Sequence, residues 1–204
     1  APLMFLTLRQ PRDEAVAETV QRSVPPLKHT VPWLASLPSF RHLCLACALH
    51  ALAMYSSQSF NPAYLARTHG WSGSSIGTLI ALVGLAGMMG TFLGGFLSDR
   101  LSRRSGDARW QMWVPGIATF AVIPVQLLAY LGAGMPMAVA FLGSSLLSLV
   151  FFGPAFSTVQ SLARPQMRAV AASLLLFSMS LIGMALGPLL IGLSSDLLAP
   201  RVGV

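Results

Sequence analysis

The sequence predicts an all-α protein, a bundle of helices that crosses a membrane several times. Hydrophobic residues make up 54% of the 204 residues and charged residues only 9%, whereas average soluble chains carry roughly a quarter charged residues. The mean hydropathy is +0.69. The charges are also segregated, because residues 70–98 and 110–163 contain none. A spanning helix needs about 20 mainly apolar residues, since its backbone polar groups must be paired within the bilayer. These runs therefore predict a polytopic membrane protein.

Five hydrophobic runs give the predicted spans, which together occupy residues 40–198. Their approximate limits are 40–60, 74–98, 110–131, 135–160 and 169–195.

The ends of the chain predict that it belongs to something longer. Residues 1–8 read as the end of a preceding hydrophobic helix, and residues 199–204 as a truncated tail. Between them and the first span, residues 9–39 form a polar connection with a short predicted helix at 13–21. We expect irregular backbone after that helix because proline breaks helices; the prolines concerned are Pro25, Pro26, Pro32 and Pro38.

Basic residues indicate how the spans are oriented. If the connection at 9–39 is cytoplasmic, eleven Lys and Arg residues lie on that side and only Arg67 and Arg201 on the other. This is the bias that membrane insertion follows. The net charge of +7 thus reflects topology, and we expect the lipid bilayer rather than nucleic acid as the partner. Cys44 and Cys47 form a lone C-x-x-C without a second ligand pair, so we expect packing and no metal or cofactor.

One short charged stretch, GGFLSDRLSRRSGDAR at 94–109, interrupts the apolar runs. Its pattern consists of Gly95, Asp99, Arg100, Arg103 and Arg104. A carboxylate at a helix end can bond basic side chains or the N-terminus of a facing helix, and such contacts suit a conformational latch. The alternative is plain topology, which explains the arginines but not a carboxylate between a glycine and an arginine.

This stretch resembles the signature loop of the major facilitator superfamily, which occurs between helices two and three and again between helices eight and nine. The superfamily usually has a glycine where this chain has Ser102. A second stretch, GMALGPLLIGLSSD, holds Gly183, Gly187 and Pro188. It is similar to the Gly-Pro motif of the fifth helix and its pseudo-repeat in the eleventh, which we interpret as a helix-packing motif.

The resemblance implies that the chain corresponds to helices seven to eleven, preceded by the end of helix six. An N-terminal six-helix half and a last helix would then lie outside it. The stretches NPAYLARTHGWS and RAVAASLLLFSMSLIGMALGPLLIGLSSDLL look like bacterial Spinster-type members of the superfamily.

Polar residues on the first span are the main candidates for a substrate cavity, since polar groups within membrane helices are costly. His50, Met54, Gln58 and Asn61 follow one another at helical spacing and share a face. His50 could relay a proton or pair with an anionic substrate; the alternative is a neutral histidine bonded to a neighbouring helix. Asn61-Pro62 is expected to end or bend this helix.

Two aromatic residues on the fourth span are further cavity candidates. Phe152 and Phe156 lie four residues apart beside Gly153-Pro154, a predicted kink. Contact with an apolar substrate and ordinary packing both fit this spacing.

These features predict a secondary active transporter of a small organic or amphiphilic solute that works by rocking-bundle alternating access, with proton coupling through His50 as one option. We expect an integral protein of the bacterial inner membrane. A transport-incompetent receptor or scaffold with the same fold is the alternative. A membrane enzyme fits least, because no carboxylate lies in the core of any span and catalysis needs clustered reactive groups.

Overall fold

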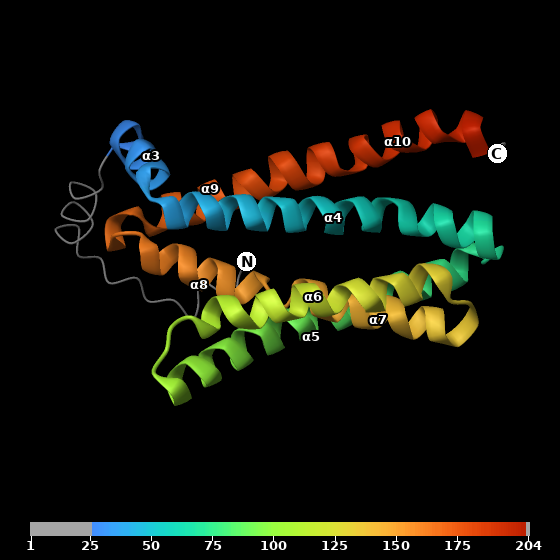
Figure 1. Cartoon of the computed structure of the whole chain (residues 1–204), viewed down its shortest axis with the longest axis horizontal. Coiled ribbons are helices and arrows are strands. Elements are labelled where there is room, and N and C mark those ends of the chain that lie inside the picture. The colour runs from blue at the N-terminus through green and yellow to red at the C-terminus, as the bar shows by residue number, and fades with distance from the viewer. Residues whose placement is uncertain (1–25, 203–204) are drawn as a thin grey trace, which may run out of the picture.

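The computed structural model describes residues 26–202, and the side chains of 26–197, as a bundle of helices (Figure 1). In chain order the elements are α3 (Leu27–Ser36), α4 (Pro38–His69), α5 (Gly73–Ser105), α6 (Trp110–Leu131), α7 (Gly134–Leu149), α8 (Phe152–Leu162), the 3₁₀ turn η1 (Pro165–Met167), α9 (Arg168–Ser178), the π-helical η2 (Met179–Leu186) and α10 (Gly187–Val202). Every regular element in this part of the chain is helical, which confirms the all-α prediction.

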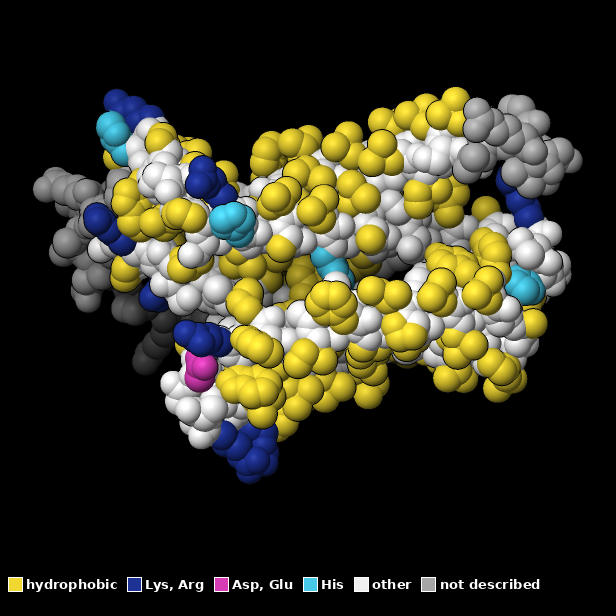
Figure 2. Space-filling model, viewed as in Figure 1, with side chains coloured by type: hydrophobic (Ala, Val, Ile, Leu, Met, Phe, Trp, Pro, Cys, Tyr) yellow, Lys and Arg dark blue, Asp and Glu magenta, His cyan; other side chains and the backbone are white. Residues whose placement is uncertain are grey.

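Five helical stretches are long and apolar enough to cross a membrane. They run over Pro38–His69, Gly73–Ser105, Trp110–Leu131, Gly134–Leu162 and Pro165–Leu197. The outer surface of these stretches is largely hydrophobic, with side chains such as Phe92 and Phe120 71% and 76% exposed (Figure 2). Lipid is the solvent that suits such a surface, so the predicted transmembrane bundle is confirmed.

Basic side chains gather at one end of the bundle, here called the basic end (Figure 2). This end holds α3, the 106–109 turn and the 163–164 turn (Figure 1). The spans form two groups: α4 packs against η2 and α10, while α7 packs against α5 and α6.

Two helices continue beyond the limits that apolarity predicts. α4 runs through Asn61-Pro62 to His69, so the expectation that this pair ends the helix is wrong. α5 likewise continues to Ser105, which places the charged motif on its last turns and not in a loop. Both helices end at glycines with positive φ, Gly70 at 64° and Gly106 at 69°, a conformation that glycine adopts without steric cost.

The prolines before the first span do not prevent regular structure. Pro26 precedes α3, Pro32 lies inside it, and Pro38 opens α4 at a position where no N–H is needed. The expected irregular backbone from Pro25 to Pro38 is therefore wrong from residue 27 on. The short helix predicted at 13–21 lies outside the described residues.

Proline also marks the two interruptions of the later spans. α7 ends at Leu149 and α8 begins at Phe152, just before Gly153-Pro154. The last span is π-helical over Met179–Leu186 and returns to α-helix at Gly187-Pro188. A proline removes one backbone donor and clashes with the carbonyl one turn earlier, which breaks the regular ladder at both sites.

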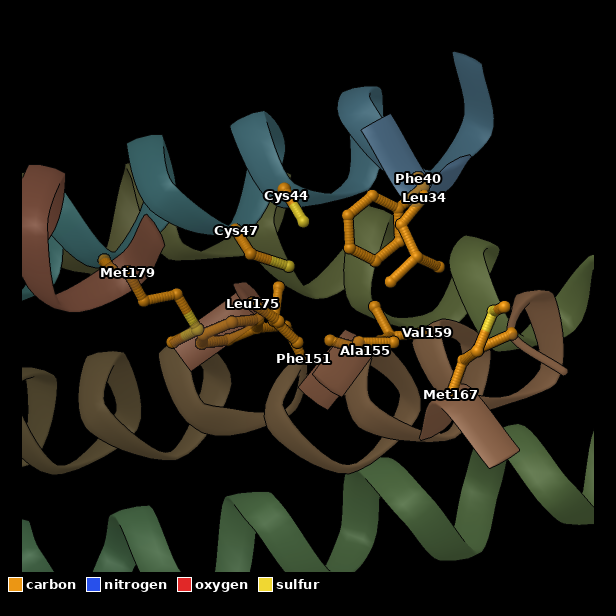
Figure 3. Close-up of a cluster of buried hydrophobic side chains, with 13 residues drawn as sticks. Leu34, Phe40, Cys44, Cys47, Phe151, Ala155, Val159, Met167, Leu175 and Met179 are labelled. Atoms are coloured by element: carbon orange, nitrogen blue, oxygen red, sulfur yellow. The ribbon is translucent and has the colours of Figure 1, made fainter. Parts of the chain in front are cut away.

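The largest buried cluster lies towards the basic end, where α4, α8 and α9 meet (Figure 3). Cys44 and Cys47 of α4 face Phe151, Leu175 and Met179 there, and both thiols are free and buried. Their environment is that of packing residues, as the lone C-x-x-C predicts.

Glycines let the helices of each group approach closely. On α5, a Cβ added at Gly90 would overlap the carbonyl group of Leu146, and one at Gly94 that of Val150. On the last span, a Cβ at Gly183 would lie 2.7 Å from the Cβ of Ala51 on α4. In a membrane, packing through small residues replaces the hydrophobic driving force.

Replacing Gly90 with Ala is expected to destabilise the bundle by about 1–3 kcal/mol, because the new methyl group meets backbone that cannot rotate away. Gly84 is the matched control, since nothing lies within 4 Å of a Cβ added there. Gly84→Ala should leave stability unchanged or raise it by up to about 1 kcal/mol. Unfolding of both variants in detergent measures the difference, and equal stability of the two would contradict the close packing.

Candidate functional site

A cavity of about 240 Å³ lies among α4, α6 and α7. α4 contributes one face, α6 the opposite wall, and α7 most of the remainder, with Val83 reaching it from α5. The polar residues that line it are His50, Ser57, Gln58, Asn61, Thr119, Gln126, Ser144, Ser145 and Ser148. Such a concentration of polar groups within an apolar bundle marks this cavity as the candidate functional site.

The four candidate residues of α4 all line this cavity: His50, Met54, Gln58 and Asn61. The aromatic candidates of the fourth span do not. Phe152 and Phe156 pack against the buried cluster of α4, α8 and α9, with their ring centroids 5.1 Å apart. Their position is therefore that of packing residues, which was the alternative interpretation of their spacing. Neither residue lines this cavity, so the cavity gives no support to contact with a substrate.

His50 is held by the interruption between α7 and α8. Its Nε2 lies 2.9 Å from the carbonyl oxygen of Ser148, and its ring lies 4.4 Å from that of Phe151 between centroids. Carbonyls in the last turn of a helix lack an intrahelical partner, so the imidazole supplies the missing donor. Because a carbonyl oxygen only accepts, Nε2 carries a proton, and the neutral ring is the Nε2–H tautomer.

Asn61 is fixed by a chain of hydrogen bonds that joins α4 to α6. The hydroxyl of Tyr130 donates to Asn61 Oδ1 at 2.7 Å, and the hydroxyl of Tyr64 donates to the Tyr130 carbonyl at 2.6 Å. His69 Nε2 lies 3.2 Å from the Tyr64 hydroxyl. That hydroxyl has already given its proton, so His69 is the donor. This network sets the side-chain orientation of Asn61.

Sequence reasoning missed the walls that α6 and α7 contribute. Gln126 and Thr119 are seven residues apart, the two-turn spacing that places both on one face of α6. The serines at 144, 145 and 148 form a polar cluster in the first half of the fourth span. Polar residues within apolar runs identified the candidates on α4. The same criterion could have identified those on α6 and α7.

The charged motif at the basic end centres on Asp99. Gln111 Nε2 of α6 donates to Asp99 Oδ1 at 2.7 Å, and Arg103 lies 3.7 Å from Oδ2 in a solvent-exposed pair. Exposed ion pairs contribute little, so the partly buried bond from Gln111 is the firmer contact. Gln111 is a further residue that the sequence did not reveal.

Other members of the motif lie around this carboxylate. The guanidinium of Arg100 lies over the ring of Phe96 at 5.8 Å, and Arg104 is exposed beside them. Nothing lies within 4 Å of a Cβ added at Gly95, but one added at Gly153 of α8 would lie 3.4 Å from the Gly95 Cα. The motif therefore adjoins the interruption of the fourth span.

The Gly-Pro stretch lies against α4. A Cβ added at Gly187 would lie 2.7 Å from Ser56 Oγ and 2.8 Å from the Leu52 carbonyl oxygen. Gly183 makes the equivalent approach one turn earlier, and Pro188 follows at the start of α10.

Metal chemistry has no candidate among residues 26–197. Within this part of the chain, no three His, Cys, Asp or Glu side chains lie where they could share an ion.

The fold and these sites define an integral membrane protein whose helices enclose a polar cavity and carry a charged motif at one end. The sequence matches the Major Facilitator Superfamily over residues 2–202, and the chain belongs to this superfamily.

A curated relative and two solved structures agree with this assignment. The relative is an MFS-type efflux pump of Mycolicibacterium smegmatis, 33% identical over 168 residues, which are 81% of this chain and 38% of that protein. The structures are of a bacterial homologue of the human lysosomal transporter Spinster in inward-facing conformations. The unoccupied one has a TM-score of 0.76 at 26% identity and covers 98% of this chain and 43% of that one. The occupied one has a TM-score of 0.70 at 30% identity, and the match covers 83% of this chain and 37% of that one.

The chain thus spans about two fifths of the length of these relatives. The predicted resemblance to the superfamily and to its bacterial Spinster-type members is confirmed.

Replacing His50 with Leu is expected to lower the free energy of unfolding by about 0.6 to 1.7 kcal/mol, the range for interhelical hydrogen bonds in membranes. His42→Leu is the control, because His42 is exposed on the same helix. Nitrogen NMR of labelled histidine should also find the His50 proton on Nε2. A neutral ring protonated on Nδ1 alone would contradict the bond to Ser148.

Proposed function

We propose that this chain forms most of one bundle of a secondary active transporter for a small organic or amphiphilic solute. The observation that carries the proposal is the polar cavity among α4, α6 and α7, inside a bundle whose outer surface is apolar. Membrane proteins retain costly polar groups of this kind where a solute must pass. The relatives, described as an efflux pump and as a Spinster homologue, support a transport role.

The solute crosses by rocking-bundle alternating access against a second, N-terminal six-helix half. His50, Met54, Gln58 and Asn61 form the face of α4 that meets the solute. Gly183 and Gly187 keep the last span and α4 together as one rigid unit, because their close contacts leave no room for sliding. Catalysis has no part in this proposal.

The motif at the basic end acts as the latch between the rocking states. Gln111 and Arg103 hold Asp99 in the state described here. The carboxylate exchanges these partners for others in the opposite state, and Gly95 allows the close approach of α8. Arg100 and Arg104 keep this end on the cytoplasmic side together with the connection at 9–39, in a bacterial inner membrane.

Reconstitution of the complete protein in liposomes tests the proposal. We expect saturable uptake or efflux of at least one member of a panel of amphiphiles and organic ions, with or without an imposed proton gradient. Absence of movement across a broad panel would contradict transport. Solute binding without any movement would point instead to the receptor with the same fold.

Replacing Asp99 with Asn is expected to slow transport about tenfold, the effect of losing roughly 1.4 kcal/mol from one state, while leaving folding intact. Asp107→Asn is the control: Asp107 lies on the neighbouring turn, and its carboxylate contacts the N–H and the guanidinium of Arg109. Initial rates in liposomes and thermal unfolding report the two effects separately. An unchanged rate for D99N would remove the latch role.

A further inference from the structure

The cavity among α4, α6 and α7 holds hydrogen-bonding groups but no charge of fixed sign. Among the described residues that line it, none is Asp, Glu, Lys or Arg. His50 is the one titratable side chain, and its Nε2–H is already engaged by Ser148. The chemistry of a ligand that fits here therefore follows from the donors and acceptors that remain.

Three of the five hydroxyl groups that line the cavity donate their protons to backbone carbonyls. Ser144 donates to Phe141 O at 3.0 Å, Ser145 to Val83 O at 2.8 Å, and Thr119 to Pro115 O at 2.8 Å. A hydroxyl in this state still has oxygen lone pairs. These three residues therefore present acceptors to a ligand.

The side-chain amides supply the donors. Asn61 accepts from Tyr130 through Oδ1, which leaves its NH₂ group as the free end. Gln58 of α4 and Gln126 of α6 both line the cavity, and neither makes a side-chain hydrogen bond to any described residue. Each can donate and accept at once.

None of the described residues that line this cavity offers a charged ligand a counter-ion of fixed sign. Removing an ion from water without a paired charge costs several kcal/mol, whereas a neutral group loses little if its hydrogen bonds are replaced. The donors and acceptors above provide that replacement. The cavity therefore favours a neutral polar group over an ion.

The remaining walls are apolar and the space is small. Its volume is about 240 Å³, just below the roughly 300–1,000 Å³ of typical small-molecule pockets. Met54, Val122, Ile123 and Phe141 are among the apolar residues that close it. The polar part suits a headgroup with a few polar atoms, and the apolar walls suit an apolar chain attached to it.

We propose that this cavity binds the uncharged, hydroxyl- or carboxamide-bearing headgroup of an amphiphile, clamped between Gln58 and Gln126. This names the solute class of the site in the proposed function and rests on it. The two amides determine specificity because they can hydrogen-bond both donor and acceptor atoms of the headgroup.

Photocrosslinking of the complete protein in lipid nanodiscs tests this. Two probes share one acyl chain with a diazirine: a monoacylglycerol, which is neutral, and a lysophosphatidate, which is anionic. We expect the monoacylglycerol to reach half-saturation at a concentration about tenfold or more below that of the lysophosphatidate, with crosslinks mapped to α4, α6 and α7. Gln58→Met and Gln126→Met should each weaken it about three- to tenfold, the effect of one neutral hydrogen bond.

Gln160→Met is the matched control, since Gln160 is exposed on α8 and does not line the cavity; it should bind like the unchanged protein. Circular dichroism verifies that each variant is folded. Equal binding of both probes, unaffected binding in both cavity variants, or crosslinks confined to the lipid-facing side of α5 and α6 would each overturn the proposal.

The assay has no gradient and no second compartment, so it is independent of transport. Selective binding by a complete protein that moves no solute would remove the proposed function and leave this inference. Transport without selective binding would remove this inference and leave the proposed function.

Discussion

Backbone polar groups that lie within a membrane must find partners inside the protein, and the structure depends on this constraint. Where proline interrupts the fourth span, the imidazole of His50 bonds the exposed carbonyl of Ser148. Where α6 ends, the Tyr64 hydroxyl bonds the carbonyl of Tyr130. Ser145 also donates to a backbone carbonyl, that of Val83 within α5. Many polar side chains of the bundle thus first bond backbone groups. Only their remaining donors and acceptors are available to a solute.

Close contacts at glycines hold the helices together alongside these hydrogen bonds. They occur in two places, between α5 and the fourth span at Gly90 and Gly94, and between α4 and the last span at Gly183 and Gly187. Each seam ends beside a proline-related interruption. Hydrogen bonds alone would tolerate small shifts of one helix along another, but backbone in contact with backbone does not. The seams therefore fix the helix positions within each group, and the cavity occupies the space between α4 and α6, where the groups are not joined by such contacts.

The sequence predicts the five spans because apolar length is what a bilayer requires, yet it misplaces the ends of α4 and α5. Those helices end where Gly70 and Gly106 adopt positive φ, a local backbone property that apolarity does not reveal. His50, Met54, Gln58 and Asn61 share a cavity because one helix sets their spacing. Phe152 and Phe156 have equally regular spacing but face the core, since the rotation of a helix about its axis depends on its neighbours. The Gln111–Asp99 bond could not be predicted from the sequence for the same reason.

The interruption of the fourth span connects the two sites of the molecule. On one side, His50 in the cavity bonds Ser148 and contacts the ring of Phe151 at a tilted angle. On the other, Gly153 lies against Gly95, one turn before Asp99 on α5. A change in the angle between α7 and α8 would therefore move both the cavity wall and the surface beside the latch. Coupling between distant sites needs an element with two arrangements that both sites bias. The turn at 150–151, where the N–H of Val150 bonds the carbonyl of Leu147 three residues earlier instead of the α-helical partner, is the described element that lies beside both sites.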